Sequence, residues 1–238
     1  MIEIVAEIGS TNSALRARLA AGEALVEGQW LIADRQNAGR GRAGRVWSGG
    51  LGNFMGSTIA TVRESDPPAA TLALVAGAAV HAAVSALAPG LADLRLKWPN
   101  DLLIGGAKLA GILLERQSDC VVVGIGVNLA EAPSLADRAT TCLALQGHVL
   151  ARDDFAEQLA AVWAETLARW HRGEWPALRQ EWLARAHPVD TPLSAEDKGQ
   201  GRIVGAFAGI DPGGAALLRL ADGTMRAIHA GDLDLIGE

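Results

Sequence analysis

An arginine- and glycine-rich segment is the first candidate for chemistry in this chain of 238 residues. Between Asp34 and Trp47 it carries four arginines, at positions 35, 40, 42 and 45, and no acidic residue after Asp34. Guanidinium groups bind carboxylates and phosphates, and the interleaved glycines leave backbone N–H groups open to the same anion. The segment therefore predicts a site for an anionic partner, with a solvated surface loop as the alternative.

The same segment matches known glycine motifs by spacing. Gly39-Arg-Gly-Arg-Ala-Gly44 fits both the dinucleotide fingerprint and the kinase glycine loop. The first must open a helix, which residues 45–52 do not favour, and the second needs an Asp-Phe-Gly, which the chain lacks. We therefore interpret both matches as accidental.

A second candidate is Lys97-Trp-Pro-Asn-Asp101, followed across a Gly105-Gly106 turn by Lys108-Leu-Ala-Gly111. A proline and two polar residues are costly inside a sheet, and such a cost is typical of a site. We expect Lys97 and Lys108 to converge, with Asp101, on a metal-bound polyphosphate. The alternative is a plain hairpin with exposed lysines.

Other features are weaker. Glycines in Val123-Gly-Ile-Gly-Val-Asn128 would let a ligand, or equally another part of the backbone, approach the sheet closely. We interpret His81, among alanines, as a core residue. The two cysteines, Cys120 and Cys142, suggest neither a disulfide framework nor a zinc site, and we expect no protein-bound metal.

The local patterns predict elements that would position these residues. We expect strands at 3–8, 30–35, 54–61, 94–98, 101–104, 108–115 and 120–129, helices at 11–21, 153–171 and 176–187, and short strands at 202–207, 215–220 and 225–229. The uncharged stretch 67–92 is long enough to span a membrane, but its many alanines favour a buried helix that starts at Asp66-Pro67. A small β-barrel should follow the 188–192 region.

Charge and the start of the chain restrict the class of protein. The net charge of −6 argues against a protein that binds nucleic acid over a whole face. The acidic start, Met1-Ile-Glu3, is unlike a secretory signal, so we expect a cytoplasmic protein without a membrane anchor.

Taken together, the motifs resemble those of the biotin protein ligase family in order and spacing. The resemblance rests on Ser10-Thr-Asn12, Gln36 to Arg45 with Trp47, Lys97 to Asp101, Lys108 to Gly111, and Gly124 to Asn128. It implies an α+β fold, with a mixed β-sheet and flanking helices like those of class II aminoacyl-tRNA synthetases. It also implies a catalytic domain at 1–187 and a small SH3-like β-barrel at 188–238. The repressor members' winged-helix domain has no counterpart, which implies the ligase-only form.

The resemblance implies an enzyme that joins biotin and ATP into biotinyl-5'-AMP and then transfers biotin to a lysine of a biotin carboxyl carrier protein. ATP and biotin would be its substrates, with Mg²⁺ accompanying ATP, and a homodimer is possible. Lys108, Arg42 and Asp101 would be catalytic, with Asp101 orienting the incoming lysine or the magnesium. The implied binding residues are Ser10, Thr11, Asn12, Gln36, Gly39, Arg40, Gly41, Arg42, Arg45, Trp47, Lys97, Asn100, Lys108, Gly111, Gly126 and Asn128.

Within this set, Ser10 to Asn12 and Gln36 would hold the biotin head group, and the arginine loop would fold over biotin and its adenylate. Asn128 would lie on the adenylate side. Two other functions stay open at this point. One is a lipoate ligase or octanoyltransferase of the same superfamily, and the other is a nucleic-acid-binding module that uses the arginine loop.

Overall fold

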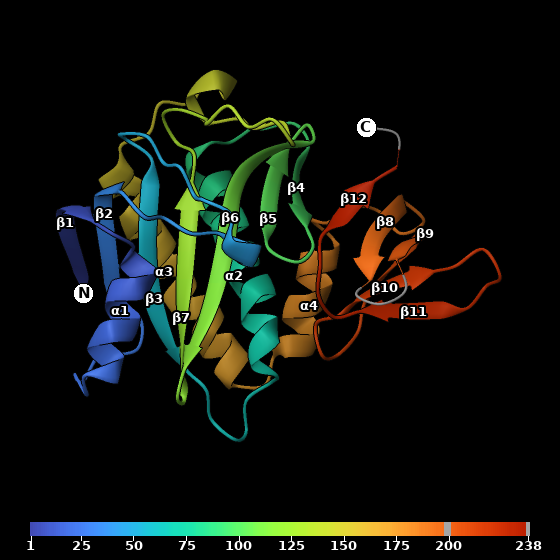
Figure 1. Ribbon diagram of the computed structural model, residues 1–238, viewed down its shortest axis with the longest axis horizontal. Helices are drawn as coiled ribbons and strands as arrows, with labels where there is room; N and C mark the ends of the chain where they lie inside the picture. Colours follow the sequence, from blue (N-terminus) through green and yellow to red (C-terminus); the bar gives the residue numbers. More distant parts are fainter. Residues whose placement is uncertain (198–200, 237–238) are drawn as a thin grey trace.

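A seven-stranded mixed sheet forms the body of the molecule (Figure 1). The computed structural model describes residues 1–197 and 201–236, so residues 198–200 and 237–238 of the expected C-terminal domain lie outside the described part. The strands follow the order β1-β2-β3-β7-β6-β5-β4, with β1 and β2 parallel and the other neighbours antiparallel. Their bounds are β1 Ile2–Ile8, β2 Trp30–Gln36, β3 Phe54–Thr61, β4 Leu94–Lys97, β5 Asp101–Ile104, β6 Ala107–Gln117 and β7 Cys120–Val127.

Helices cover the sheet unequally. Three of them, α2 (Leu72–Leu87), α3 (Arg152–His171) and α4 (Trp175–Leu183), lie on one face, and α1 (Thr11–Ala20) lies on the other (Figure 1). Ser10 caps α1 by accepting a hydrogen bond from the backbone N–H of Ser13. Leu15 of α1 packs in a small cluster with buried residues of β2, β3 and β7. The short α1 covers only part of its face, which leaves room beside its N-terminus for a ligand.

The alanine-rich stretch forms α2, whose apolar residues pack in the core. Ala69–Leu87 is the one segment among the described residues that is long and apolar enough to cross a membrane, but 61% of it is buried in the molecule. The predicted start at Asp66-Pro67 is wrong, because α2 begins at Leu72 after a 3-10 turn at Ala69–Thr71. The Thr71 hydroxyl donates to Pro68 O and accepts from the Trp170 indole, and these contacts hold the tighter turn.

The end of α4 also differs from the prediction, which extended the helix to His187. The helix stops at Leu183, and the next residues pair with the edge of the sheet. Leu96 N donates to Arg185 O at 2.8 Å, and Leu96 and Ala186 form a parallel bridge. Pairing with β4 therefore competes with further helical turns.

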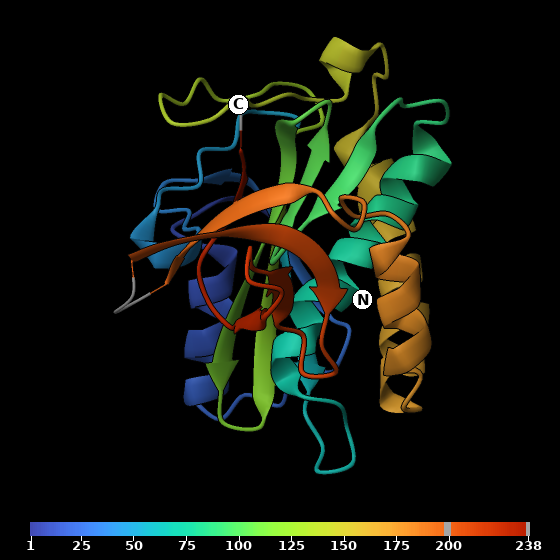
Figure 2. The ribbon, with the colours of Figure 1, turned by 90° about the vertical axis from the view of Figure 1, so that its right-hand side faces the viewer.

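A second, five-stranded antiparallel sheet lies beside β4, β5 and α4 (Figures 1 and 2). It comprises β8 Pro192–Asp197, β9 Gly201–Ile210, β10 Ala216–Arg219, β11 Met225–Ile228 and β12 Leu233–Leu235, in the order β11-β10-β9-β8-β12. The sequence patterns predicted β9, β10 and β11 but missed β8 and β12. β8 begins at a proline, which usually weakens a strand assignment, and β12 has only three residues.

The two sheets share one core. Leu193, Phe207 and Leu218 of the second sheet belong to the same buried cluster as the residues of α2 and α4. The indole N–H of Trp98 donates to Gly214 O at 2.9 Å, and that of Trp175 donates to Pro212 O at 2.7 Å. The second sheet is therefore packed against the first as part of the same core.

Candidate active site

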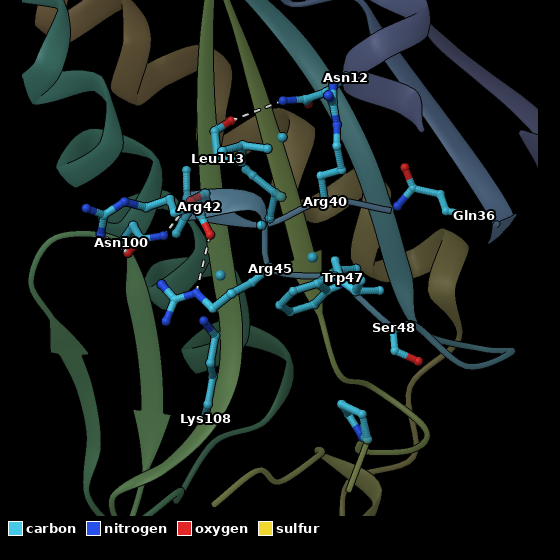
Figure 3. Close-up of a pocket in the computed structure, with 18 of the residues that line it drawn as sticks. Asn12, Gln36, Arg40, Arg42, Arg45, Trp47, Ser48, Asn100, Lys108 and Leu113 are labelled. Atoms are coloured by element: carbon cyan, nitrogen blue, oxygen red, sulfur yellow. Dashed lines mark hydrogen bonds between the residues drawn. The ribbon is translucent and has the colours of Figure 1, made fainter. Parts of the chain in front are cut away.

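A cavity of about 310 Å³ opens on the sheet face that carries α1 (Figure 3). This volume is at the lower end of the range for small-molecule sites. The cavity brings together most of the residues predicted from the sequence, from segments as distant as Ser10 and Asn128. The predicted residues in its lining are Ser10, Thr11, Asn12, Gln36, Arg40, Gly41, Arg42, Arg45, Trp47, Asn100, Lys108, Gly111, Gly126 and Asn128.

One end of the cavity is a chain of neutral polar groups. Gln36 Oε1 accepts from Thr11 N at 2.7 Å, and the Thr11 hydroxyl lies 2.6 Å from the Ser57 hydroxyl. Ser57 donates to Asn12 Oδ1 at 2.6 Å, and Asn12 Nδ2 donates to a Glu115 carboxylate oxygen at 3.0 Å. Thr11, Asn12 and Ser57 are all buried. The chain holds these side chains in fixed orientations, which suits recognition of a compact polar ligand group.

The floor of the cavity is made by glycines that face one another across β6 and β7. Gly111 is paired with Gly126, and the Trp47 ring lies against both positions. A Cβ atom at Gly126 would overlap this ring, and one at Gly111 would lie 3.2 Å from it. Glycine at these two positions is therefore what lets Trp47 reach the sheet.

Lys108 reaches the cavity through an irregularity in β6. The pairing of β5 with β6 shifts between Leu102 and Leu103, so Leu103 is paired with Lys108 but Leu102 with Ala110. In a regular strand Lys108 would share the core face with Ala110, whereas a bulge reverses the face. Lys108 Nζ consequently lies over Gly111, 5.8 Å from the centroid of the Trp47 ring.

Asp101 holds the ammonium group in place. Lys108 Nζ lies 2.6 Å from Asp101 Oδ1, and the two side chains are 15% and 13% exposed. Asp101 is the first residue of β5 and is paired directly with Gly111. The strand predicted at 94–98 ends one residue earlier, at Lys97, and Trp98 to Asn100 form the turn between β4 and β5. The turn ends where Asp101 can meet Lys108.

The arginine-rich segment forms a narrow hairpin over the cavity. Arg40 and Val46 are bridged, Gly41 N donates to Arg45 O at 2.7 Å, and Trp47 N donates to Gly39 O at 3.0 Å. The close backbone approach explains the glycine, since a Cβ at Gly39 would lie 2.5 Å from Trp47 O. The segment was predicted as an irregular loop because its sequence has neither helical nor strand periodicity. The backbone hydrogen bonds that make it a hairpin leave no such pattern in the sequence.

Two arginines of this hairpin meet one carboxylate, that of Asp232, which directly precedes β12 of the second sheet. Arg42 Nη1 lies 3.2 Å from Asp232 Oδ1, and Arg45 Nη1 lies 2.8 Å from Asp232 Oδ2. Arg42 also donates to Asn100 Oδ1 at 3.0 Å and to Gly231 O at 3.0 Å. Figure 3 shows Arg42 and Arg45 on the same side of the cavity as Lys108, with Asn12 and Gln36 on the other side. The cavity thus has a cationic end at Lys108, Arg42 and Arg45, and an end of neutral polar groups that is bordered by the Arg40–Glu115 ion pair.

The electrostatics of Asp232 follow from this arrangement. Burial acts to raise the pKa of Asp232, but the hydrogen bond from Arg45 and the charges of Arg45, Arg42 and Arg138 outweigh it, so the pKa lies below its ordinary value. Asp232 is therefore ionised at neutral pH and holds both guanidinium groups.

Three predicted residues lie outside the cavity lining. Lys97 was expected to converge with Lys108, but its ammonium group binds Asp234 at 3.2 Å, because β4 borders the second sheet. Gly39 supports the hairpin, as described above, and Asp101 acts through Lys108. The predicted convergence of the two lysines is therefore wrong.

Asn128 lines the cavity next to the backbone of Lys108. It is 1% exposed, and its Nδ2 donates to Thr141 O at 3.0 Å. Its Oδ1 is buried and has no hydrogen-bond partner within residues 1–197 and 201–236. A buried acceptor without a partner is costly, so this oxygen fits a ligand that donates a hydrogen bond.

Several residues of the site were missed in the sequence. They are Ser57, Glu115, Asp232 and the loop that contributes Pro133, Leu135, Asp137, Arg138 and Thr140. Ser57 alone carried a local signal, since it is a polar residue within the apolar strand β3. Glu115 is positioned by Arg16 at 2.7 Å and Arg40 at 3.3 Å, contacts that only the tertiary structure creates.

The structure bears on two other predictions. No group of three or more His, Cys, Asp or Glu side chains that could hold a metal ion occurs in the described ranges. His81 is half-buried on α2, and burial, followed by the charge of Arg185, lowers its pKa to about 4. His81 lies outside the cavity lining, but it is only half-buried and is not part of the core that was predicted for it.

The fold and the site define a known class of protein. Residues 8–128 match the model of the biotin/lipoate A/B protein ligase family, and residues 194–235 match that of the biotin protein ligase C-terminal domain. The chain belongs to the biotin/lipoate A/B protein ligase family.

Within this family, the chain is similar to several enzymes named as biotin ligases. The chain is 38% identical to a biotin--[acetyl-CoA-carboxylase] ligase of Paracoccus denitrificans, over 91% of this chain and 93% of the relative. It is 36% identical to the enzyme of the same name from Mycobacterium tuberculosis, over 98% of this chain and 88% of the relative. A biotin protein ligase from Aquifex aeolicus, solved in complex with biotin and ATP, superimposes with a TM-score of 0.85 at 26% identity, covering 99% of this chain and 98% of the other.

Proposed function

We infer that this protein is a biotin protein ligase. It activates biotin with ATP to biotinyl-5'-AMP and transfers the biotinyl group to a lysine of a biotin carboxyl carrier protein. The inference is carried by one observation: the two halves of the cavity differ in the way that these substrates require. A chain of neutral donors and acceptors is joined to a cluster of arginine and lysine side chains over a glycine floor.

The neutral end suits the ureido ring of biotin. This ring presents two N–H donors and one carbonyl acceptor, and it carries no charge. Thr11, Asn12, Ser57 and Gln36 offer hydroxyl and amide groups that are already held in position by one another. We assign them, with Ser10, to the head group, which they would recognise without reorganisation.

The cationic end suits the activation step. A carboxylate oxygen of biotin forms a bond to the α-phosphorus of ATP, and the bond from this phosphorus to the bridging oxygen breaks, so pyrophosphate leaves with the electron pair. Biotin is already ionised at neutral pH, so no general base is needed. The barrier comes from bringing two anions together, which fixed cations reduce. We assign Lys108 to the reacting phosphate and Arg40, Arg42 and Arg45 to the hairpin that covers the intermediate.

The transfer step needs a free amine. The acceptor lysine attacks the acyl carbon, the C–N bond forms, the C–O bond to phosphate breaks, and AMP leaves while the amine loses a proton. We propose that Asp101 orients Lys108 and the incoming amine. Mg²⁺ would enter bound to the phosphates of ATP and neutralise part of their charge.

Several finer assignments belong to the same proposal. We propose that residues 1–187 form a catalytic domain related to class II aminoacyl-tRNA synthetases and that residues 188–238 form an SH3-like barrel. We also propose that the protein acts in the cytoplasm and binds no nucleic acid, which its net charge of −6 supports. Homodimer formation stays a prediction that sedimentation would test.

One assay tests the function. The protein is incubated with magnesium, ATP and either biotin or lipoate, and pyrophosphate release is followed together with the mass of an added biotin-carrier fragment. We expect pyrophosphate and a biotinylated fragment with biotin alone. Modification with lipoate in place of biotin would assign the chain to the lipoate branch of its family, and the absence of either product would refute the proposal.

A further inference from the structure

The irregular loop between β7 and α3 is anchored to the backbone of Lys108 itself. Lys108 N donates to Ala139 O at 2.9 Å, and Thr141 N donates to Lys108 O at 3.0 Å. Asn128 Nδ2 donates to Thr141 O, and the Thr140 hydroxyl binds Pro133 O, which closes the base of the loop. Any residue just before Thr140 therefore has a fixed position relative to the Lys108 backbone.

Arg138 occupies such a position, and its side chain lines the cavity. The guanidinium donates to the carboxylate of its neighbour Asp137, at 3.1 Å from Nε and 2.8 Å from Nη2. An ion pair between adjacent residues at the surface is weak and is exchanged easily for a stronger anion. Arg138 is 27% exposed, so it is screened less than an open surface charge.

The charges around Arg138 show which part of the cavity it faces. The hydrogen bond to Asp137 raises the pKa of Arg138, and the charges of Asp101 and Asp232 raise it further. Asp101 is the carboxylate that holds Lys108, and Asp232 is the one that holds Arg42 and Arg45. Arg138 therefore lies near both cation-holding carboxylates, and it lines the same cavity as Lys108, Arg42 and Arg45 from a separate loop.

We propose that Arg138 binds the β- and γ-phosphates of ATP and stabilises the pyrophosphate that leaves in the activation step. The proposal rests on the ligase function inferred above. When the bond between the α-phosphorus and the bridging oxygen breaks, the negative charge grows on the departing pyrophosphate. A guanidinium that can leave Asp137 binds two of its oxygens at once. The adenylate that stays behind has no β- or γ-phosphate, so Arg138 contributes to the first half-reaction and not to the second.

The test separates the two half-reactions. In Arg138→Gln we expect kcat/KM for ATP in pyrophosphate release to fall about 10- to 100-fold, the effect of losing one charge-assisted hydrogen-bonding group. The affinity for added inorganic pyrophosphate, measured as product inhibition, should fall by a similar factor. Transfer from preformed biotinyl-5'-AMP to the carrier fragment should stay within twofold of the unchanged protein, and Arg138→Lys should recover part of the loss.

Control variants distinguish a failure of the proposed role of Arg138 from a failure of the ligase function. Arg172→Gln removes an exposed arginine at the end of α3 and should change none of these quantities. Asp137→Asn should strengthen pyrophosphate inhibition, because it removes the anion that competes for Arg138. Equal losses in activation and transfer, or unchanged pyrophosphate inhibition in Arg138→Gln, would overturn the proposal. If the unchanged protein released no pyrophosphate from biotin and ATP, the ligase function itself would fall, whatever Arg138 does.

Discussion

Arg42 and Asp232 form an ion pair across the mouth of the cavity, with 3.2 Å between Nη1 and Oδ1 and 190 positions of sequence between them. The pair joins the hairpin that covers the site to the second sheet. Arg42, Asp232 and Arg45, which binds the same carboxylate, are partly exposed, so these contacts can open without disturbing the core. The second sheet thereby helps to set the position of the covering hairpin.

The first prediction concerns retention of the intermediate. Arg42→Gly removes three hydrogen bonds that hold the hairpin, to Asn100, Asp232 and Gly231, and adds backbone freedom. We expect this variant to make biotinyl-5'-AMP and release it, so that lysines of a bystander protein such as albumin become biotinylated. Arg63→Gly, which removes an exposed arginine far from the cavity, serves as the control. Retention of the adenylate by Arg42→Gly would count against the covering role of the hairpin.

The second prediction concerns pH and stability. Asp232 has a pKa below its ordinary value, so its ion pairs stabilise the fold above the unfolded pKa, and that contribution is lost as pH falls through the lowered pKa. Because the side chains are about a third exposed, the contribution at pH 7 should be at most about 1 kcal/mol. Urea unfolding of Asp232→Asn and the unchanged protein should differ at pH 7, and the difference should shrink as the pH falls below the ordinary pKa of an aspartate, about 4. A difference that grows on acidification would contradict this sign.

The third prediction concerns the charge at the reacting phosphate. Lys108→Gln should lower the rate of pyrophosphate release by a factor that corresponds to ~2.7–4 kcal/mol of transition-state stabilisation, or about 10²–10³-fold. The change also leaves Asp101 without its partner, so the double variant Asp101→Asn, Lys108→Gln controls for an unpaired carboxylate. Activity restored in the double variant would mean that Lys108 serves only to balance Asp101.

The fourth prediction concerns the glycine floor. Gly126→Ala places a methyl group where the Trp47 ring lies, so the ring and the hairpin must move. We expect the protein to lose about 1–3 kcal/mol of folding stability, the usual cost of overpacking, and biotin binding, measured by calorimetry, to weaken because the ring leaves its place. Gly213→Ala, in a turn of the second sheet where only the Asp211 side chain comes close, is the matched control. Unchanged biotin binding in Gly126→Ala would show that Trp47 has no part in the site.

Much of the fold could be read from local patterns. β3 and β5 have the predicted bounds, since each is an apolar run between clear turn signals. The start of α2 could not be read, because the Thr71 contacts with Pro68 and Trp170 decide it. β8 was hidden by its initial proline and because Pro192–Asp197 does not alternate polar and apolar residues: Leu193, Ser194 and Ala195 are buried in succession.

The site shows the same limit. Site residues that are adjacent in sequence, such as Ser10 to Asn12, could be recognised from their residue types. Asp232 did not, because it is one of many acidic residues until the chain folds and brings it to Arg42 and Arg45. The failed convergence of Lys97 has the same cause, since folding brings Asp234, 137 positions away in sequence, to its ammonium group. Contacts between residues that are distant in sequence leave no motif of fixed spacing from which they could be predicted.

The indole hydrogen bonds from Trp98 and Trp175 to the 212–214 turn also restrict where the polypeptide can be truncated. A fragment that ended after α4 would expose to water the apolar residues that the second sheet covers, and it would aggregate. Truncated or split versions of this protein should therefore retain the second sheet and be divided at an exposed turn instead.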